Sequence, residues 1–387
     1  MDRLTSGALI DRHRRAPEQC LYCTRPATSG EHAVPQAIGG RLWANILCPE
    51  HNRIIGARTD EPFSANVRPL VNLLRVRRHD GNVGVSFDGV TDDGRTMTVT
   101  SDGRVPLLAL EVEKRDERGR ITRAKGDLSR LDNLMRQGAF ATTGTNHVIA
   151  TIGKAPPLTF EVGSDRASEA GVLKIALHFF AGFISDVPAA VANELLPFVF
   201  GEQLAGGKYV RTPPFDNVLF PSAWPPRHEI TCFPAGDRTY VSVLLFDAYP
   251  YLCRLPVVMP VEGGIRYRQP LLGAPDPQFD IDVAVPQFDW ERRLSSENQQ
   301  GWSDEIMRRL DRIGEHAQRQ ELLEQCEAAA KRADARAAGG GDFWEWYRAE
   351  LQSECMESAA IERILSLGRR ARARGKDVWE LEVVFRT

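Results

Sequence analysis

Four residues near the start of the chain have the types and spacing of a zinc site. Cys20 and Cys23 form one pair, Cys48 and His51 form a second, and two residues separate the members of each pair. This spacing lets both side chains of a pair reach one ion, and three thiolates with one imidazole suit tetrahedral Zn²⁺. We therefore predict a structural Cys3His zinc site. An ion with four protein ligands has no open position, so catalysis would need other residues.

The segment between the two pairs supplies such residues. Residues 29–40 have the sequence SGEHAVPQAIGG, and Asn52 directly follows the last ligand. The pattern resembles the zinc-containing branch of the HNH, or ββα-metal, endonuclease family, over roughly one-eighth of the chain. The matching motifs are Glu31-His32, Ala33-Val34-Pro35, Gly39-Gly40 and Cys48-x-x-His51-Asn52.

Two positions depart from the family pattern. His51 stands where the family usually has a second cysteine, and imidazole is an ordinary zinc ligand. Asn52 stands where the last histidine often stands, which resembles the His-Asn-Asn variant of phage endonucleases that resolve branched DNA. The resemblance implies a small treble-clef-like ββα-metal fold around the zinc site.

The resemblance also implies a role for each matching residue. His32 would be the general base, Glu31 and Asn52 would hold a catalytic Mg²⁺ or Mn²⁺, and Asn45 would brace the loop that carries His32. A neutral imidazole can take a proton from water. A hard cation with oxygen ligands can stabilise the departing 3′ oxygen of a phosphodiester.

Three of these assignments have competing interpretations. Glu31 and His32 are adjacent, so a regular strand would point them to opposite faces; the family resemblance implies a turn or loop at the strand end instead. An ordinary turn asparagine explains Asn45 equally well. Asp60 could add a metal contact, but a helix N-cap or a solvated acid is the favoured interpretation.

The charge distribution favours a nucleic-acid contact near the N-terminus. The whole chain has a net charge of −3, but residues 1–80 hold twelve arginines and no lysine against eight acidic residues, a net charge of +4. Arg41, Arg53 and Arg58 flank the proposed site and are candidates for phosphate contacts. DNA is the expected partner, and RNA is an alternative substrate because backbone recognition need not exclude the 2′-hydroxyl.

Other candidate residues favour structural interpretations. The cluster at 75–79 is basic, and the segment from Lys114 to Lys125 holds six basic residues alternating with acids, as expected for a solvated hairpin tip. His178 lies in an apolar helix without a partner at ligand spacing, so a buried, hydrogen-bonded histidine is expected.

Periodicity divides the chain into three regions and predicts an α+β protein. Residues 1–66 form the zinc and HNH region, residues 67–288 form an α+β body, and residues 289–387 are mainly helical with a break at Gly339-Gly340-Gly341. Helices are expected from Ser168, as N-cap, to Ile184 and from Ala189 to Leu196. Strands are expected at 84–90, 95–101, 104–112, 146–152, 229–233, 239–246 and 279–285.

Composition narrows the class of protein. The first twenty residues lack the apolar core of a secretory signal, and no apolar stretch is long enough to cross a bilayer, so we expect a cytoplasmic protein without a membrane partner. The sequence predicts an HNH endonuclease, with bacterial defence or restriction as a suggested role. A homodimer would present two heads for double-strand cleavage. The alternative is a non-catalytic zinc module that binds nucleic acid or protein.

Overall fold

The computed structural model describes residues 6–74, 76, 87–91, 96–99, 107–108, 111–125, 158–159, 165–213, 220, 225–271, 276–286, 296–353 and 358–373. The fold is mixed α+β, as predicted, with a helical C-terminal region. It has two compact units, Met1–Asp311 and Arg312–Thr387. The boundaries at residues 66 and 288 stay predictions. The strand expected at 146–152 and most of the basic cluster at 75–79 lie outside the described residues.

The first unit begins with a short helix, a two-stranded hairpin and a continuous helical segment. After α1 (Ser6–His13), strands β1 (Ser29–His32) and β2 (Trp43–Leu47) pair antiparallel, and the single turn η1 (Gln36–Ile38) lies between them. Helix α2 (Pro49–Ile55) follows β2 after one residue and continues through the π-helical turn η2 (Gly56–Asp60) into α3 (Glu61–Leu73). Together β1, β2 and α2 make a ββα unit.

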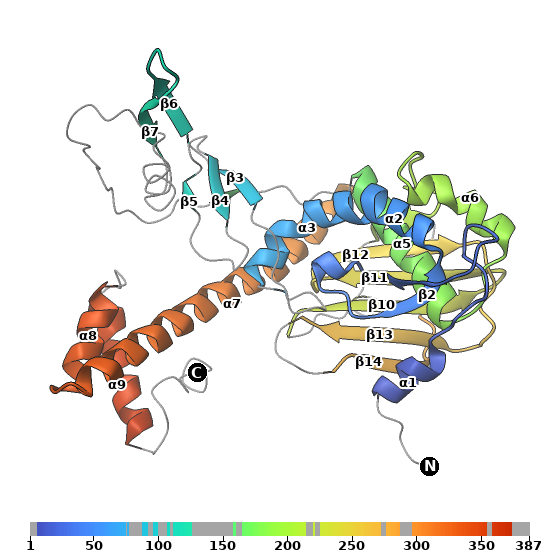
Figure 1. The fold of residues 1–387 in the computed structure, drawn as a ribbon. Coiled ribbons are helices and arrows are strands. Elements are labelled where there is room, and N and C mark those ends of the chain that lie inside the picture. The colour runs from blue at the N-terminus through green and yellow to red at the C-terminus, as the bar shows by residue number, and fades with distance from the viewer. Residues whose placement is uncertain are drawn as a thin grey trace. The chain divides into compact units, whose positions relative to one another are not determined.

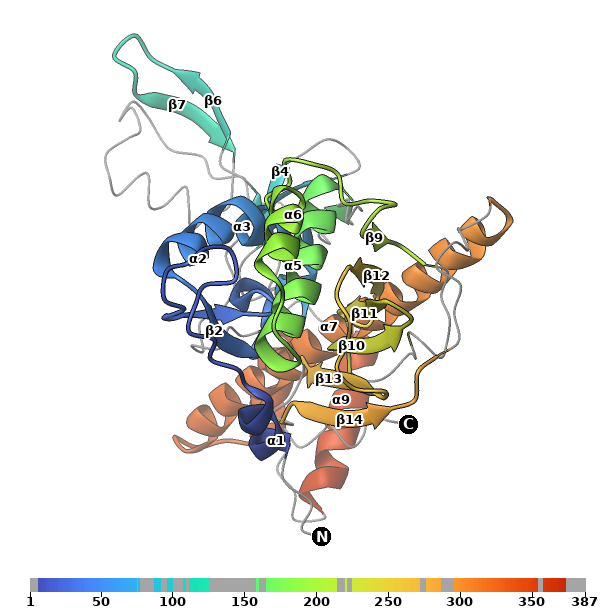
Figure 2. The ribbon, with the colours of Figure 1, turned by 90° about the vertical axis from the view of Figure 1, so that its right-hand side faces the viewer.

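The largest sheet of the described residues is antiparallel and has six strands in the order β14-β13-β10-β11-β12-β9 (Figure 1, with β9 labelled in Figure 2). Its strands are β9 (Val210–Arg211), β10 (Arg227–Ala235), β11 (Arg238–Leu245), β12 (Tyr249–Leu255), β13 (Gly264–Pro270) and β14 (Gln278–Val283). The strands predicted at 229–233, 239–246 and 279–285 correspond to β10, β11 and β14. Strands β12 and β13 were not predicted; β12 contains Pro250, and β13 contains the charged residues Arg266 and Arg268.

Helix α5 (Arg166–Phe183) lies between the ββα unit and the six-stranded sheet, beside α6 (Ala189–Val199) (Figure 2). It is buried on all sides from Ala170 to Phe183 because both neighbours cover it. The predicted N-cap was wrong: Asp165 caps the helix, and its Oδ1 accepts a hydrogen bond of 2.8 Å from the backbone N–H of Ser168.

Close packing against α5 requires glycine at Gly171. A Cβ there would lie 2.3 Å from Cγ of Phe63 on α3. Absence of a side chain therefore sets the distance between α3 and α5.

Smaller strands lie between α3 and α5 in the sequence. They are β3 (Phe87–Thr91), β4 (Thr96–Val99), β5 (Leu107–Leu108), β6 (Glu111–Arg115), β7 (Ile121–Lys125) and β8 (Leu158–Thr159). The turn between β6 and β7 exposes Arg115, Glu117 and Arg118. This confirms that the segment from Lys114 to Lys125 is a hairpin with a solvated tip.

The described residues of the C-terminal region form three helices. Helix α7 (Ser296–Ala337) begins in the first unit and ends in the second, and α8 (Phe343–Ser353) and α9 (Ser358–Arg372) follow it. The helical break predicted at the three glycines is confirmed. Tyr347 of α8 packs in a core with Ala330 of α7 and Leu365 of α9. Among the described residues, no helix is both long and apolar enough to span a membrane.

Candidate metal centre and adjoining ion cluster

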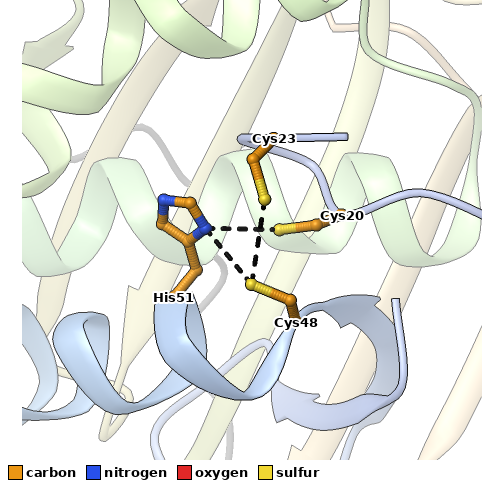
Figure 3. A group of neighbouring side chains, drawn as sticks. All are labelled: Cys20, Cys23, Cys48 and His51. Atoms are coloured by element: carbon orange, nitrogen blue, oxygen red, sulfur yellow. Dashed lines mark hydrogen bonds between the residues drawn. The ribbon is translucent and has the colours of Figure 1, made fainter. Parts of the chain in front are cut away.

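The four predicted zinc ligands come together in the first unit and form what we call the Cys3His cluster (Figure 3). Cys20 and Cys23 lie in the turn before β1, where the N–H of Cys20 bonds to the carbonyl of Arg25 across 2.8 Å. Cys48 is the N-cap residue of α2, and His51 lies in its first turn. A turn and a helix start therefore place one ligand pair each.

The distances within the Cys3His cluster fit one tetrahedral ion. Nδ1 of His51 lies 3.6 Å from Sγ of Cys20 and 3.4 Å from Sγ of Cys48, and the thiols of Cys23 and Cys48 are 3.8 Å apart. Zinc bond lengths place two sulfurs about 3.8 Å apart and a sulfur and a nitrogen about 3.5 Å apart. The residues thus fit the predicted ion, although the identity of the metal stays a prediction.

The thiols of the Cys3His cluster differ in proton affinity. Burial raises the pKa of Cys20 to about 11. Burial also acts to raise the pKa of Cys48, but hydrogen bonds from the backbone and ring of His51, with those of the neighbouring thiols, lower it to about 7. Because metal binding requires thiolates, an ion at this site would displace protons.

The ββα unit positions the proposed catalytic residues on two faces of its hairpin. His32 is the last residue of β1 and pairs with Trp43, while Asn45 pairs with Gly30. All of these are partly or fully exposed, and they alternate with the buried residues Glu31 and Ala44. His32 and Asn45 therefore share the outer face, and Glu31 points to the inner face toward α5.

The expected turn between Glu31 and His32 was therefore wrong. Both belong to β1, because the pairing with β2 continues through Glu31–Ala44 and His32–Trp43. In a paired strand, consecutive side chains point to opposite faces. The structure does not place these two side chains side by side.

Asn52 connects α2 to β1. Its amide Nδ2 donates hydrogen bonds to Oγ of Ser29 at 2.6 Å and to the carbonyl of Gly30 at 3.3 Å. No contact between Asn52 and Glu31 occurs among the interactions of the described residues. The amide group braces the hairpin against the helix.

The inner face of the hairpin adjoins a group of buried or partly buried ionisable side chains, which we call the ion cluster: Tyr22, Glu31, Asp60, Lys174 and His178. Lys174 of α5 forms an ion pair with Glu31, and its Nζ lies 3.1 Å from Oδ1 and 3.3 Å from Oδ2 of Asp60. Lys174 also donates a hydrogen bond of 2.6 Å to the carbonyl of His32. The side chain of Lys174 is fully buried.

Burial and ion pairing set the protonation of this cluster. Burial alone would raise the pKa of Glu31, but Lys174 and His178 lower it to about 2. Burial would lower the pKa of Lys174, but Asp60 and Glu31 raise it. Burial raises the pKa of Asp60 to about 6, with Lys174 opposing the rise. At neutral pH one ammonium therefore faces two carboxylates.

His178 is buried and hydrogen-bonded, as predicted, but its partner was missed. Nδ1 lies 3.3 Å from Oε1 of Glu31, and Nε2 lies 3.0 Å from the hydroxyl of Tyr22. Burial lowers the pKa of His178, which favours the neutral ring. Lys174 and His178 are four residues apart on one apolar helix, and that spacing was the sequence signal for a shared polar partner.

The favoured interpretation of Asp60 was wrong. The helix does not start at Asp60, because η2 continues directly into α3, and its side chain makes no capping hydrogen bond. Its carboxylate instead faces Lys174, and its side chain is only one-fifth exposed.

The three candidate phosphate-binding arginines lie in different surroundings. Arg53 is exposed on α2, whereas Arg58 forms an ion pair of 2.8 Å with Glu202 and lies over the ring of Phe200. The backbone N–H of Arg41 donates to Oε1 of Gln269 at 3.0 Å. Arg53 and Arg58 are thus both exposed, and Arg58 is in addition held by Glu202.

The loop after His32 is attached to the six-stranded sheet. Nε2 of His228 lies 2.9 Å from the carbonyl of Ile38, and the amide of Gln269 donates to the carbonyl of Gly39 at 2.5 Å. Gly39 has a φ of 92°, and a Cβ on Gly40 would lie 1.9 Å from the carbonyl oxygen of Val34. The Gly-Gly motif therefore serves a tight turn and a close backbone approach.

Comparison with known proteins found no matching family model, no match among curated proteins and no match among solved structures.

Proposed function

We propose that this chain is an endonuclease of the ββα-metal type that hydrolyses phosphodiester bonds of DNA, with His32 as the general base. The observation that carries the proposal is the order and placement of its parts. A Cys-x-x-Cys turn, a strand ending in His32, a docked loop, a second strand and a helix that carries Asn52 surround one Cys3His cluster.

The position of His32 supports this role. It stands at the end of β1 on the outer face of the hairpin, partly exposed, while its backbone carbonyl is fixed by Lys174. In the proposed reaction its imidazole takes a proton from water, the water oxygen bonds to phosphorus, and the bond from phosphorus to the 3′ oxygen breaks. The departing 3′ oxygen takes a proton from solvent.

A Mg²⁺ or Mn²⁺ ion held by Glu31 and Asn52 does not fit this conformation. Such an ion would supply charge stabilisation at the phosphate. The carboxylate of Glu31 is instead paired with Lys174 and His178 on the inner face, and the amide of Asn52 is bonded to β1. We derive no catalytic step through that ion.

Because Glu31 and Asn52 are already bound to neighbouring residues, a second candidate function is a non-catalytic zinc module that binds nucleic acid or protein. In this alternative, Glu31 and Asn52 only hold the hairpin against α5 and α2. Exposed Arg53 would then serve binding without cleavage.

The test is cleavage of supercoiled plasmid in Mg²⁺ or Mn²⁺, with a parallel single-stranded RNA substrate. We expect cleavage by the wild type and a loss of at least about 100-fold in His32→Ala, the usual contribution of a general base. His13→Ala, which changes a histidine of α1 outside the hairpin, is the matched control and is expected to cleave normally.

Each other outcome contradicts part of the proposal. Full activity in His32→Ala would refute its role as base. Cleavage of RNA but not of DNA would show that RNA, and not DNA, is the substrate. Absence of cleavage by folded, metal-loaded wild type, with retained DNA binding, would favour the non-catalytic module.

A further inference from the structure

Glu31 and Asp60 face each other across a buried cation. Their carboxylates belong to β1 and to the end of η2, and the ammonium of Lys174 from α5 contacts both. Three chain segments thus converge at one positive charge.

The surroundings of this charge resemble those of a metal ion more than those of an ordinary surface lysine. Nζ of Lys174 contacts Glu31, Asp60 and the carbonyl of His32, which matches its three N–H donors. Carboxylate and carbonyl oxygens are also the ligands that Mg²⁺ and Mn²⁺ prefer. Nδ1 of His178 lies beside the same carboxylate oxygen of Glu31.

The charges of this group leave an anionic excess. Two carboxylates face one ammonium, and burial lowers the pKa of His178, which disfavours a second positive charge. Oδ1 of Asp60 is buried without a hydrogen bond among the described residues, although Nζ of Lys174 lies 3.1 Å away. A buried carboxylate oxygen in this state favours a nearby cation.

We propose that Glu31, Asp60 and the His32 carbonyl form a cation site whose resident cation is the Lys174 ammonium, so that a divalent ion binds there only when this ammonium is absent. The site is distinct from the Cys3His cluster, which has its own four ligands. The inference holds whether or not the chain cleaves nucleic acid, because ion binding tests it.

Occupation of the site by the Lys174 ammonium explains why Glu31 cannot bind a catalytic metal ion in this conformation. An ammonium and a divalent cation cannot share the same oxygens, since both are positive and each needs contact distance. Divalent-ion binding at Glu31 therefore requires that Lys174 first lose its contacts.

The experiment measures Mn²⁺ binding by equilibrium dialysis on the full chain with the Cys3His cluster loaded. We expect Lys174→Ala to bind one Mn²⁺ more than the wild type, and the added site to disappear in Lys174→Ala/Glu31→Gln. Lys208→Ala, which removes an exposed lysine, is the matched control and should bind as the wild type does. A folded Lys174→Ala that gains no Mn²⁺ would overturn the proposal.

Two further measurements keep the test decisive if Lys174→Ala is poorly folded. Lys174→Met retains the volume without the charge, and Mn²⁺ should raise its unfolding temperature more than that of the wild type. The wild type and Glu31→Gln should bind equal amounts of Mn²⁺. A wild-type Mn²⁺ site that is lost in Glu31→Gln would refute occupation by Lys174.

Discussion

The ammonium of Lys174 donates a hydrogen bond of 2.6 Å to the backbone carbonyl of His32. One buried side chain of α5 thereby fixes both the main chain at His32 and the side chain of Glu31. Any chemistry at His32 depends on an element that lies far from it in the sequence.

Removal of this contact should destabilise the first unit strongly. Lys174→Ala leaves Glu31 buried without its cation, and breaking a buried ion pair costs about 3–5 kcal/mol. Urea denaturation gives the free energy of unfolding. Lys208→Ala breaks an ion pair that is more than half exposed on the lysine side, and should cost less than about 1 kcal/mol. Equal losses in the two variants would contradict the structural role of Lys174.

Loss of one ligand should empty the Cys3His cluster. We expect the wild type to retain one zinc ion per chain after dialysis and Cys23→Ser to retain none, because the closed tetrahedral site needs all four ligands. Metal content is measured by atomic emission. Cys253→Ala removes a buried thiol of the sheet and should keep the ion. Zinc retained in Cys23→Ser would refute the ligand assignment.

Two glycines of the ββα unit should respond in opposite directions. Gly40→Ala places a Cβ 1.9 Å from the carbonyl oxygen of Val34, so the loop must move and stability should fall by at least about 2 kcal/mol. Gly56→Ala adds a Cβ with nothing within 4 Å in a helical conformation, and should stabilise by about 0.5–1 kcal/mol. Thermal and urea unfolding compare the variants. An unchanged Gly40→Ala would show that the loop adapts freely.

His228 should make stability dependent on pH. Burial lowers its pKa from 6.5 to about 4, so between these values the unfolded chain binds more protons than the folded chain. The contribution of neutral His228 to the free energy of unfolding is therefore fully present above pH 6.5 and is lost as the pH falls toward 4. The loss amounts to about 2 kcal/mol between pH 7 and pH 5.

The matched variant for His228 is His228→Gln, whose amide can still donate to the carbonyl of Ile38. Urea denaturation at pH 7 and 5 should show a smaller acid loss in this variant than in the wild type. Acid release of metal affects both proteins and cancels in the difference. Equal pH dependence would exclude His228 as its source.

The local parts of the site could be predicted from sequence, and its long-range contacts could not. The Cys3His cluster was predicted because each ligand pair lies within one turn or one helix start, where spacing fixes geometry. The partner of His178 was missed because Glu31 is 147 residues away. Spacing within the sequence does not indicate which distant helix packs against the inner face of a hairpin.

The fold shows the same division. Helices α5 and α6 and the strands β10, β11 and β14 were predicted from local sequence patterns, whereas β12 was missed because Pro250 near its start argues against a strand. Asp60 was misassigned because a lone acid of this kind is typical of a helix cap. The continuous helical backbone through η2 leaves no free N–H groups there for a cap to bind.

Burial of the inner face of the hairpin against α5 limits how this protein can be recombined. Residues 1–66 contain every motif of the ββα unit, yet Ala44, Ile46 and Glu31 find their cover on a helix that begins 100 residues later in the chain. A fragment ending at residue 66 would present two apolar side chains and an unpaired carboxylate to water. We therefore expect that residues 1–66 will not fold correctly when they are transferred to another protein by themselves. Exchange between related chains should succeed only when α5 is transferred together with them.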